Sequence, residues 1–204
     1  MGYNPHMTKP DANRAISFME LLHAFQRVER VPKMPRMERR ENDVEHSYLL
    51  AMLAWYLVDS LDIDLNKEKV LKYALAHDLV EIYAGDTYAF TKDQAAKDSK
   101  RQREENAHQR IKKEFLEFKD LDAAIGEYER RRDKESVFVY ALDKLIPMLT
   151  NYIQDGRPWK EADTAFDEVV KYKRERIGDE PFVRELLEQI ITLIEKDRAR
   201  YFDR

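Results

Sequence analysis

An all-α fold is predicted by three features of the sequence. Apolar residues recur every three or four positions along most of the chain, which is the spacing of amphipathic helices. Glycine occurs only 5 times and proline 7 times among 204 residues, a balance typical of helical globular proteins. The chain also contains no internal repeat and no β-hairpin signal. We therefore expect one helical domain over residues 11–204, preceded by a flexible leader, residues 1–10.

The first two helices are predicted on either side of a proline-containing loop. Helix 11–30 carries apolar residues at three-residue steps, namely Ile16, Met19, Leu22, Phe25 and Val28. Two prolines then break regular structure and leave a basic loop through Arg40. Asn42 or Asp43 is a suitable N-cap for the second helix, which is expected to end at residue 60.

The middle of the chain predicts one buried helix and one highly charged helix. The buried helix begins after an N-cap at Asn66, continues to Ile82 and is ended by Gly85. Its inward face consists of Val70, Leu71, Ala74, Leu75 and Leu79. Residues 87–99 are expected to form a loop before the charged helix, 99–118. The few apolar anchors of that helix are Ile111, Phe115 and Phe118.

The C-terminal part predicts four more helices. A short helix over 121–131 precedes a central buried helix around the apolar run 137–146, which Pro147 is expected to kink. The final helices are predicted over 161–176 and 181–201. The inward residues of the last one are Leu186, Leu187, Ile190, Ile191 and Ile194.

Charge and composition exclude several classes of function. The chain has 36 Lys and Arg against 40 Asp and Glu, so it lacks the basic field that holds a nucleic-acid polymer. Without cysteine it has neither disulfides nor a thiolate metal site. No apolar stretch is long enough for a membrane span, and the first ten residues do not resemble a signal peptide. A cytoplasmic location is therefore expected.

A pair of metal-binding residue types, His77 and Asp78, stands in the apolar interior of the third predicted helix. Burying both without partners would be costly, which favours a shared ligand. Adjacent helical side chains of these lengths can still converge on one ion. Glu81 lies one turn after His77 on the same face, so it can reach the rim of whatever His77 binds.

Two residues from distant segments are candidates to complete such a site. His46 precedes a strongly apolar stretch, and Asp143 stands in an almost entirely apolar helix. Two histidines and two carboxylates suit divalent Mn, Co, Fe, Ni or Zn. Such an ion assists hydrolysis of a phosphate ester, with Glu81 orienting or deprotonating the attacking water. The alternative is purely structural: His77 bonded to Asp78, with Asp143 paired to an arginine.

The order of these residues, together with their flanks, resembles the HD-domain superfamily of metal-dependent phosphohydrolases. The segments that carry the resemblance are Glu45-His46-Ser47, Ala76-His77-Asp78-Leu79-Val80-Glu81-Ile82 and Gly85-Asp86. They are similar to the subgroup of bacterial 5′-deoxynucleotidases and their eukaryotic HD-domain relatives, and the similarity covers residues 18–156. The resemblance implies an HD-domain helical bundle and a small nucleotide substrate. Dimers are common among such proteins, so a homodimer is one expected assembly.

The resemblance also implies a role for each site residue. One divalent ion would be held by His46, His77, Asp78 and Asp143. Glu81 would be catalytic, and Arg30, expected at the end of the first helix, would orient the phosphate. Asp86 would contact the sugar, and Thr87 would belong to the same substrate-binding turn.

Two departures from the subgroup leave sugar and base selectivity open. The bacterial enzymes have Trp after the arginine, where this chain has Val31, and Pro-Thr where it has Tyr88-Ala89. Alternative functions are an HD hydrolase of a nucleoside triphosphate or guanosine tetraphosphate, and a non-catalytic metal-stabilised binding module. Hydrolases of guanosine tetraphosphate typically carry a Glu-Asp pair after the doublet, whereas here Ile82 follows Glu81.

Overall fold

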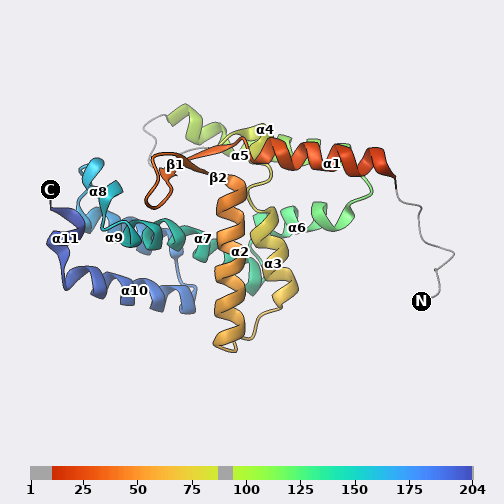
Figure 1. Ribbon diagram of the computed structural model, residues 1–204. Helices are drawn as coiled ribbons and strands as arrows, with labels where there is room; N and C mark the ends of the chain where they lie inside the picture. The colour runs from red at the N-terminus through yellow and green to blue at the C-terminus, as the bar shows by residue number, and fades with distance from the viewer. Residues whose placement is uncertain (1–10, 87–93, 204) are drawn as a thin grey trace.

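The computed structural model describes residues 11–86 and 94–203, apart from the side chains of residues 96 and 97. The predicted leader, 1–10, lies outside the described residues. The all-α prediction is confirmed except for one small hairpin (Figure 1). In chain order the elements are α1 (Ala12–Phe25), β1 (Glu29–Lys33), β2 (Arg40–Asn42), α2 (Asp43–Ser60), α3 (Lys67–Ala76), α4 (Glu81–Ala84), α5 (Gln94–Glu114), α6 (Lys119–Arg130), α7 (Lys134–Ile153), α8 (Arg157–Glu161), α9 (Phe166–Ile177), α10 (Pro181–Glu195) and α11 (Arg198–Phe202).

The hairpin of β1 and β2 was not predicted. The first helix ends at Phe25. The residues expected to form its last turn and the loop after it include β1, which pairs antiparallel with β2 so that Glu29 lies opposite Asn42. Pro32 fits this strand because a two-stranded ribbon has only edges, where a missing N–H is tolerated. The hairpin matters for the site because β1, and not a helix end, carries Arg30.

α1 packs on the molecule over only part of its length. The predicted apolar stripe is wrong at Ile16 and Met19, whose side chains are 57% and 50% exposed. Phe18 contacts Phe115 edge to face at 5.4 Å, and Phe25 is buried. The spacing of apolar residues predicted the helix correctly, but it did not predict which of those residues are covered by the rest of the protein.

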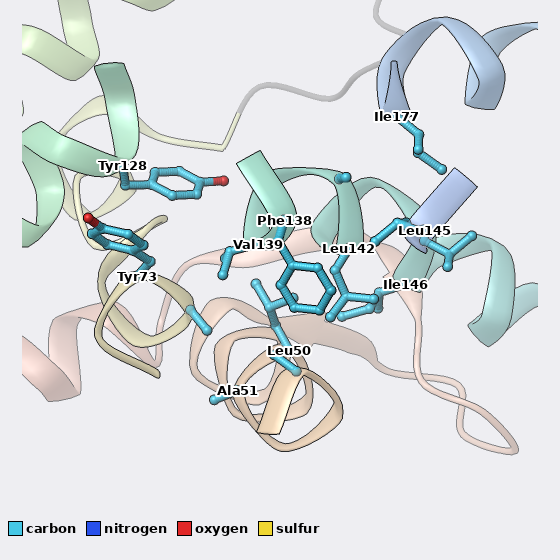
Figure 2. Close-up of a cluster of buried hydrophobic side chains, with 14 of the residues drawn as sticks. Leu50, Ala51, Tyr73, Tyr128, Phe138, Val139, Leu142, Leu145, Ile146 and Ile177 are labelled. Atoms are coloured by element: carbon cyan, nitrogen blue, oxygen red, sulfur yellow. The ribbon is translucent and has the colours of Figure 1, made fainter. Parts of the chain in front are cut away.

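The core is centred on α7, as the apolar run predicted. α7 contacts α2, α3, α9 and α10, and Figure 1 shows α2 and α3 side by side across it. Figure 2 shows Phe138 and Leu142 of α7 meeting Leu50 of α2, and all three are buried. Pro147 lies inside α7 without ending it. Within the described residues, no helix is long and apolar enough to cross a bilayer.

The third predicted helix is interrupted at the histidine-aspartate pair. α3 ends at Ala76, and α4 begins at Glu81. Between them the backbone tightens, because Leu79 N–H donates to Ala76 and Glu81 N–H donates to Asp78, three residues back instead of four. Gly85, at φ 73°, then stops α4. Leu75, predicted to face inward, is 54% exposed.

Several other predicted boundaries also differ. α5 begins at Gln94, five residues inside the expected loop, and Phe118 lies beyond its end and is partly exposed. The helix predicted over 161–176 begins later, at Phe166, as α9, and the short α8 before it was not predicted. The helix predicted over 181–201 is divided into α10 and α11. Trp159 of α8 stacks on Phe202 of α11 at 4.8 Å, which holds these short helices together.

Candidate metal centre

The four predicted metal ligands converge from three separate elements. Asn42 and Glu45 form a capping box that starts α2, which places His46 in its first turns. The tight turn between α3 and α4 presents His77 and Asp78. Asp143 stands in the middle of α7.

Distances between donor atoms define a compact cluster. Nε2 of His46 lies 2.9 Å from Oδ1 of Asp143, and Nε2 of His77 lies 4.0 Å from the same oxygen. Ligand atoms of these three residues all lie within 4.8 Å of one another, and all three residues are buried. Oδ2 of Asp78 is 3.0 Å from Nε2 of His77. This spacing is compatible with one ion bound by all four.

The chemistry of His77 fits a metal better than a purely structural pair. Its Nδ1 lies 3.0 Å from the carbonyl oxygen of Ala74, so Nδ1 carries the proton and the lone pair of Nε2 points into the cluster. Within residues 11–86 and 94–203, Nε2 makes no hydrogen bond despite being close to Asp78, and Oε2 of Glu81 is likewise buried without a partner. Such buried atoms are costly unless an ion or ligand binds them.

Charges across the cluster favour ionised carboxylates at the ligand positions. Burial opposes ionisation of Asp143, but Lys144, His46 and His77 outweigh it and hold the pKa of that carboxyl well below its usual range. Asp78 behaves in the same way: burial is outweighed by His77 and Arg30, and its pKa is lowered. Both carboxylates are therefore ready to accept a cation at neutral pH.

Glu81 and Asp43 behave in the opposite way. Burial, together with the charges of Asp78 and Asp43, raises the pKa of Glu81 well above its usual range. Burial and Asp78 raise the pKa of Asp43 to about 6, although Arg30 opposes the rise. These two carboxyl groups thus hold protons more readily than the ligands beside them.

Arg30 lies among the acids and does not face open solvent. Its Nη1 donates to Oδ2 of Asp78 at 2.6 Å and to Oδ1 of Asp43 at 3.1 Å. Its Nε is 3.7 Å from Glu41. Asp43, Asp78 and Glu81 form a second cluster of ligand atoms within 4.8 Å of one another, and Arg30 supplies a cation to two of its members. Among the described residues, none accepts a hydrogen bond from Nη2.

The remaining predicted substrate residues are only partly described. Asp86 follows the turn at Gly85 and is half-buried, and burial raises its pKa. Arg30 opposes that rise, which places Asp86 within the electrostatic range of the site. Thr87, like Tyr88 and Ala89, lies outside the described residues.

Sequence reasoning missed four residues that touch this site. Asp43 is fully buried, although it was recognised only as a candidate helix cap; its place three residues before His46, on the same helix face, was the available signal. Tyr128 of α6 packs edge to face on the ring of His77 at 5.7 Å (Figure 2 shows its hydroxyl directed away from Tyr73). Glu41 and Lys144 are the other two, and nothing in their spacing distinguishes them.

Comparison with known proteins gives both a family and named relatives. A family model described as an HD domain matches residues 20–184. The human protein named 5'-deoxynucleotidase HDDC2 is 32% identical over 136 residues, which cover 65% of this chain and 64% of the human protein. The Danio rerio protein of the same name is 31% identical over 133 residues, 64% of each chain. The chain thus spans slightly less than two thirds of these relatives.

Solved structures of similar fold include two proteins described as phosphohydrolases. A crystal structure described as a predicted metal-dependent phosphohydrolase from Magnetospirillum magnetotacticum matches with a TM-score of 0.67 at 27% identity, over 88% of this chain and 92% of that one. An HD-domain phosphohydrolase from Listeria innocua matches in fold alone, with a TM-score of 0.56 at 17% identity over 91% and 94% of the two chains. Because the family model covers most of the sequence, this chain belongs to the HD-domain family.

Proposed function

We propose that this protein is a metal-dependent phosphohydrolase that removes the 5′-phosphate from nucleoside monophosphates, with deoxyribonucleotides preferred. The observation that carries the proposal is the convergence of His46, His77 and Asp143 on one point, with Nε2 of His77 buried and unpartnered. Asp78 adjoins them and completes the proposed ligand set. The named relatives are 5'-deoxynucleotidases, which supports this choice of substrate.

Different residues of the chain are proposed to accept the proton, orient the phosphate and contact the nucleoside. When bound, a divalent ion supplies a Lewis acid that polarises the phosphoryl oxygen and acidifies water. Glu81 accepts the proton of the attacking water at Oε2, which is buried and free, and its raised pKa makes it a better proton acceptor than an exposed glutamate. Arg30 orients the phosphate through Nη2 while Nη1 holds Asp78. Asp86 and Thr87 are proposed to contact the nucleoside.

A nucleotide panel tests the substrate. Purified protein is loaded in turn with Mn, Co, Fe, Ni and Zn and offered nucleoside monophosphates, nucleoside triphosphates and guanosine tetraphosphate, with phosphate and pyrophosphate measured separately. We expect inorganic phosphate from monophosphates, fastest with a transition metal such as Mn or Co, and none in excess chelator. Pyrophosphate release would assign the protein to another HD hydrolase class. No release with any metal would favour a binding module, and full activity in chelator would contradict the metal mechanism.

We also propose a homodimer formed through the outer face of α2. That face exposes Val44, Tyr48, Leu49, Met52, Trp55 and Tyr56. The sequence from His46 to Val58 has no acidic or basic side chain other than the buried His46, so two copies can meet there without opposing like charges. Light scattering on Trp55→Glu should report a monomer. Leu193→Glu, on the exposed side of α10, is the matched control and should leave a dimer intact.

The cytoplasmic location expected from the sequence stays a prediction. Cell fractionation with an antibody against the protein would test it.

A further inference from the structure

Lys144 binds the metal-ligand candidate that precedes it in the chain. Its Nζ donates to Oδ2 of Asp143 at 2.5 Å, while Oδ1 of the same carboxylate faces Nε2 of His46 at 2.9 Å. The two oxygens of Asp143 therefore have separate partners. One faces the proposed metal centre, and the other faces an ammonium group outside it.

This ion pair is not an automatic result of adjacency in the chain. Neighbouring residues on a helix point about 100° apart and do not normally face each other, so the lysine stem must fold back across α7. Nζ lies 5.1 Å from the ring centroid of Tyr140, a cation–π contact that also binds the ammonium. Lys173 of α9 donates to the main-chain carbonyl of Lys144 at 2.5 Å, which holds the backbone at this position.

Pro147 makes such support more important at Asp143. Because proline lacks an N–H, the carbonyl of Asp143 receives no hydrogen bond from the residue four positions later. The main-chain hydrogen bonding of α7 is therefore interrupted at Asp143, a proposed metal ligand. Contacts of the side chain, including the one from Lys144, must then hold the carboxylate in place.

We propose that Lys144 is a positioning residue that presents Asp143 to the metal through Oδ1 alone and thereby sets the metal affinity of the site. With Oδ2 occupied by the ammonium, the carboxylate cannot rotate to offer both oxygens or to turn away from the histidines. The ammonium also offsets part of the cost of keeping the carboxylate ionised at 4% side-chain exposure. The inference rests on the proposed function only in that Asp143 is a metal ligand.

Metal affinity measured without substrate is the direct test. Competition with a chromophoric chelator would give the dissociation constants of Mn²⁺ and Co²⁺ for wild type, Lys144→Met and Lys144→Arg. Loss of a partner outside the coordination sphere typically weakens metal binding by about 10- to 100-fold, which is the effect expected for Lys144→Met. Lys144→Arg keeps a donor for Oδ2 and should recover most of the affinity.

The matched control is Lys134→Met, on the same helix. Lys134 also pairs with an aspartate, with Nζ 2.6 Å from Oδ2 of Asp64, but far from the site and in solvent. It should leave the dissociation constant unchanged. If Lys144→Met does not fold by circular dichroism, Lys144→Gln, which retains one donor, takes its place and should weaken binding by less.

Three outcomes would overturn the inference: wild-type affinity in Lys144→Met, an equal loss in Lys134→Met, or no recovery with arginine. Failure of the proposed function looks different. If wild type binds Mn²⁺ and Lys144→Met binds it weakly, but neither releases phosphate from any nucleotide, then the role of Lys144 is supported and the proposed reaction is wrong. A wild type that binds no divalent ion contradicts both.

Discussion

The two clusters of ligand-type side chains at this site differ in what each lacks. The cluster of His46, His77 and Asp143 mixes nitrogen and oxygen ligand atoms, and Nε2 of His77 is buried with no hydrogen-bond partner in the described part of the chain. The neighbouring cluster of Asp43, Asp78 and Glu81 contains only carboxylates, and the guanidinium of Arg30 already binds two of them. The first cluster therefore leaves a histidine nitrogen open for an external ligand, whereas the second already holds a guanidinium between two of its carboxylates. In the proposed function, the first cluster and Asp78 bind the metal, while Glu81 and Arg30, at the second cluster, act on the proton and the phosphate.

The largest effect is expected when a proposed metal ligand of the first cluster is removed. His46→Ala or Asp143→Ala should abolish metal binding, because each removes a donor from a buried set that cannot be replaced by solvent. The folded state should also lose stability as the remaining buried group loses its partner. Elemental analysis of the purified variants decides the matter, and wild-type metal content in either one would show that the ligands are wrongly assigned.

Glu81→Ala probes the second cluster. Since Glu81 is assigned to the proton and not to the metal, the variant should keep its metal while turnover falls by about 10² to 10⁴, the usual effect of losing a positioned general base. Metal content and phosphate release are measured on the same preparation. Near-normal turnover, or a preparation without metal, would move Glu81 to another role.

Arg30→Ala tests whether the internal cation of the second cluster also serves the substrate. The guanidinium contacts Asp78 and is proposed to contact the phosphate in both the ground and transition states, so KM should rise and kcat should fall together. A charge-assisted hydrogen bond is worth roughly 1.5–3 kcal/mol, which corresponds to about a 10- to 150-fold loss of kcat/KM. Lys33→Ala, a half-buried position on the same strand that pairs with Glu38 outside the cluster, is the control. A reduced kcat with an unchanged KM would show that Arg30 holds Asp78 but does not bind the phosphate.

The smallest expected effect is on the pH dependence of stability, and it comes from Lys173, a buried lysine with no carboxylate partner among the described residues. Burial and the nearby charge of Lys144, opposed by Asp143, lower the pKa of Lys173 from its usual 10.5 to about 7. The folded protein then binds fewer protons than the unfolded chain between about pH 7 and 10.5, so its stability should rise with pH across that window. Lys173→Met should remove this rise. Its stability should exceed that of the wild type by most at and below pH 7, where the buried lysine of the wild type is charged. Chemical denaturation at several pH values measures it, and parallel pH profiles for the two proteins would contradict the expected titration.

Local sequence pattern was enough for the helical class and for the residues that converge at the site. His46, His77, Asp78 and Asp143 were recognisable because polar groups in apolar helices need compensating partners, and Glu81 because helical spacing places it beside His77. Spacing could not reveal that the backbone tightens between His77 and Glu81, because that turn results from how α3 and α4 pack against α5 and α7.

Only the tertiary structure decided which partners those residues have. The hairpin that carries Arg30 has no strong local signal and forms where its strands lie across the end of α2, so the position and engagement of Arg30 could not be predicted. The same holds for Asp43 and Lys144. Each looks like an ordinary helix cap or surface lysine in the sequence, and its role depends on the direction of one side chain toward residues far away in the chain or, for Lys144, back across its own helix. A one-dimensional period specifies which face of a helix is apolar, but the groups that meet that face are set by packing in three dimensions.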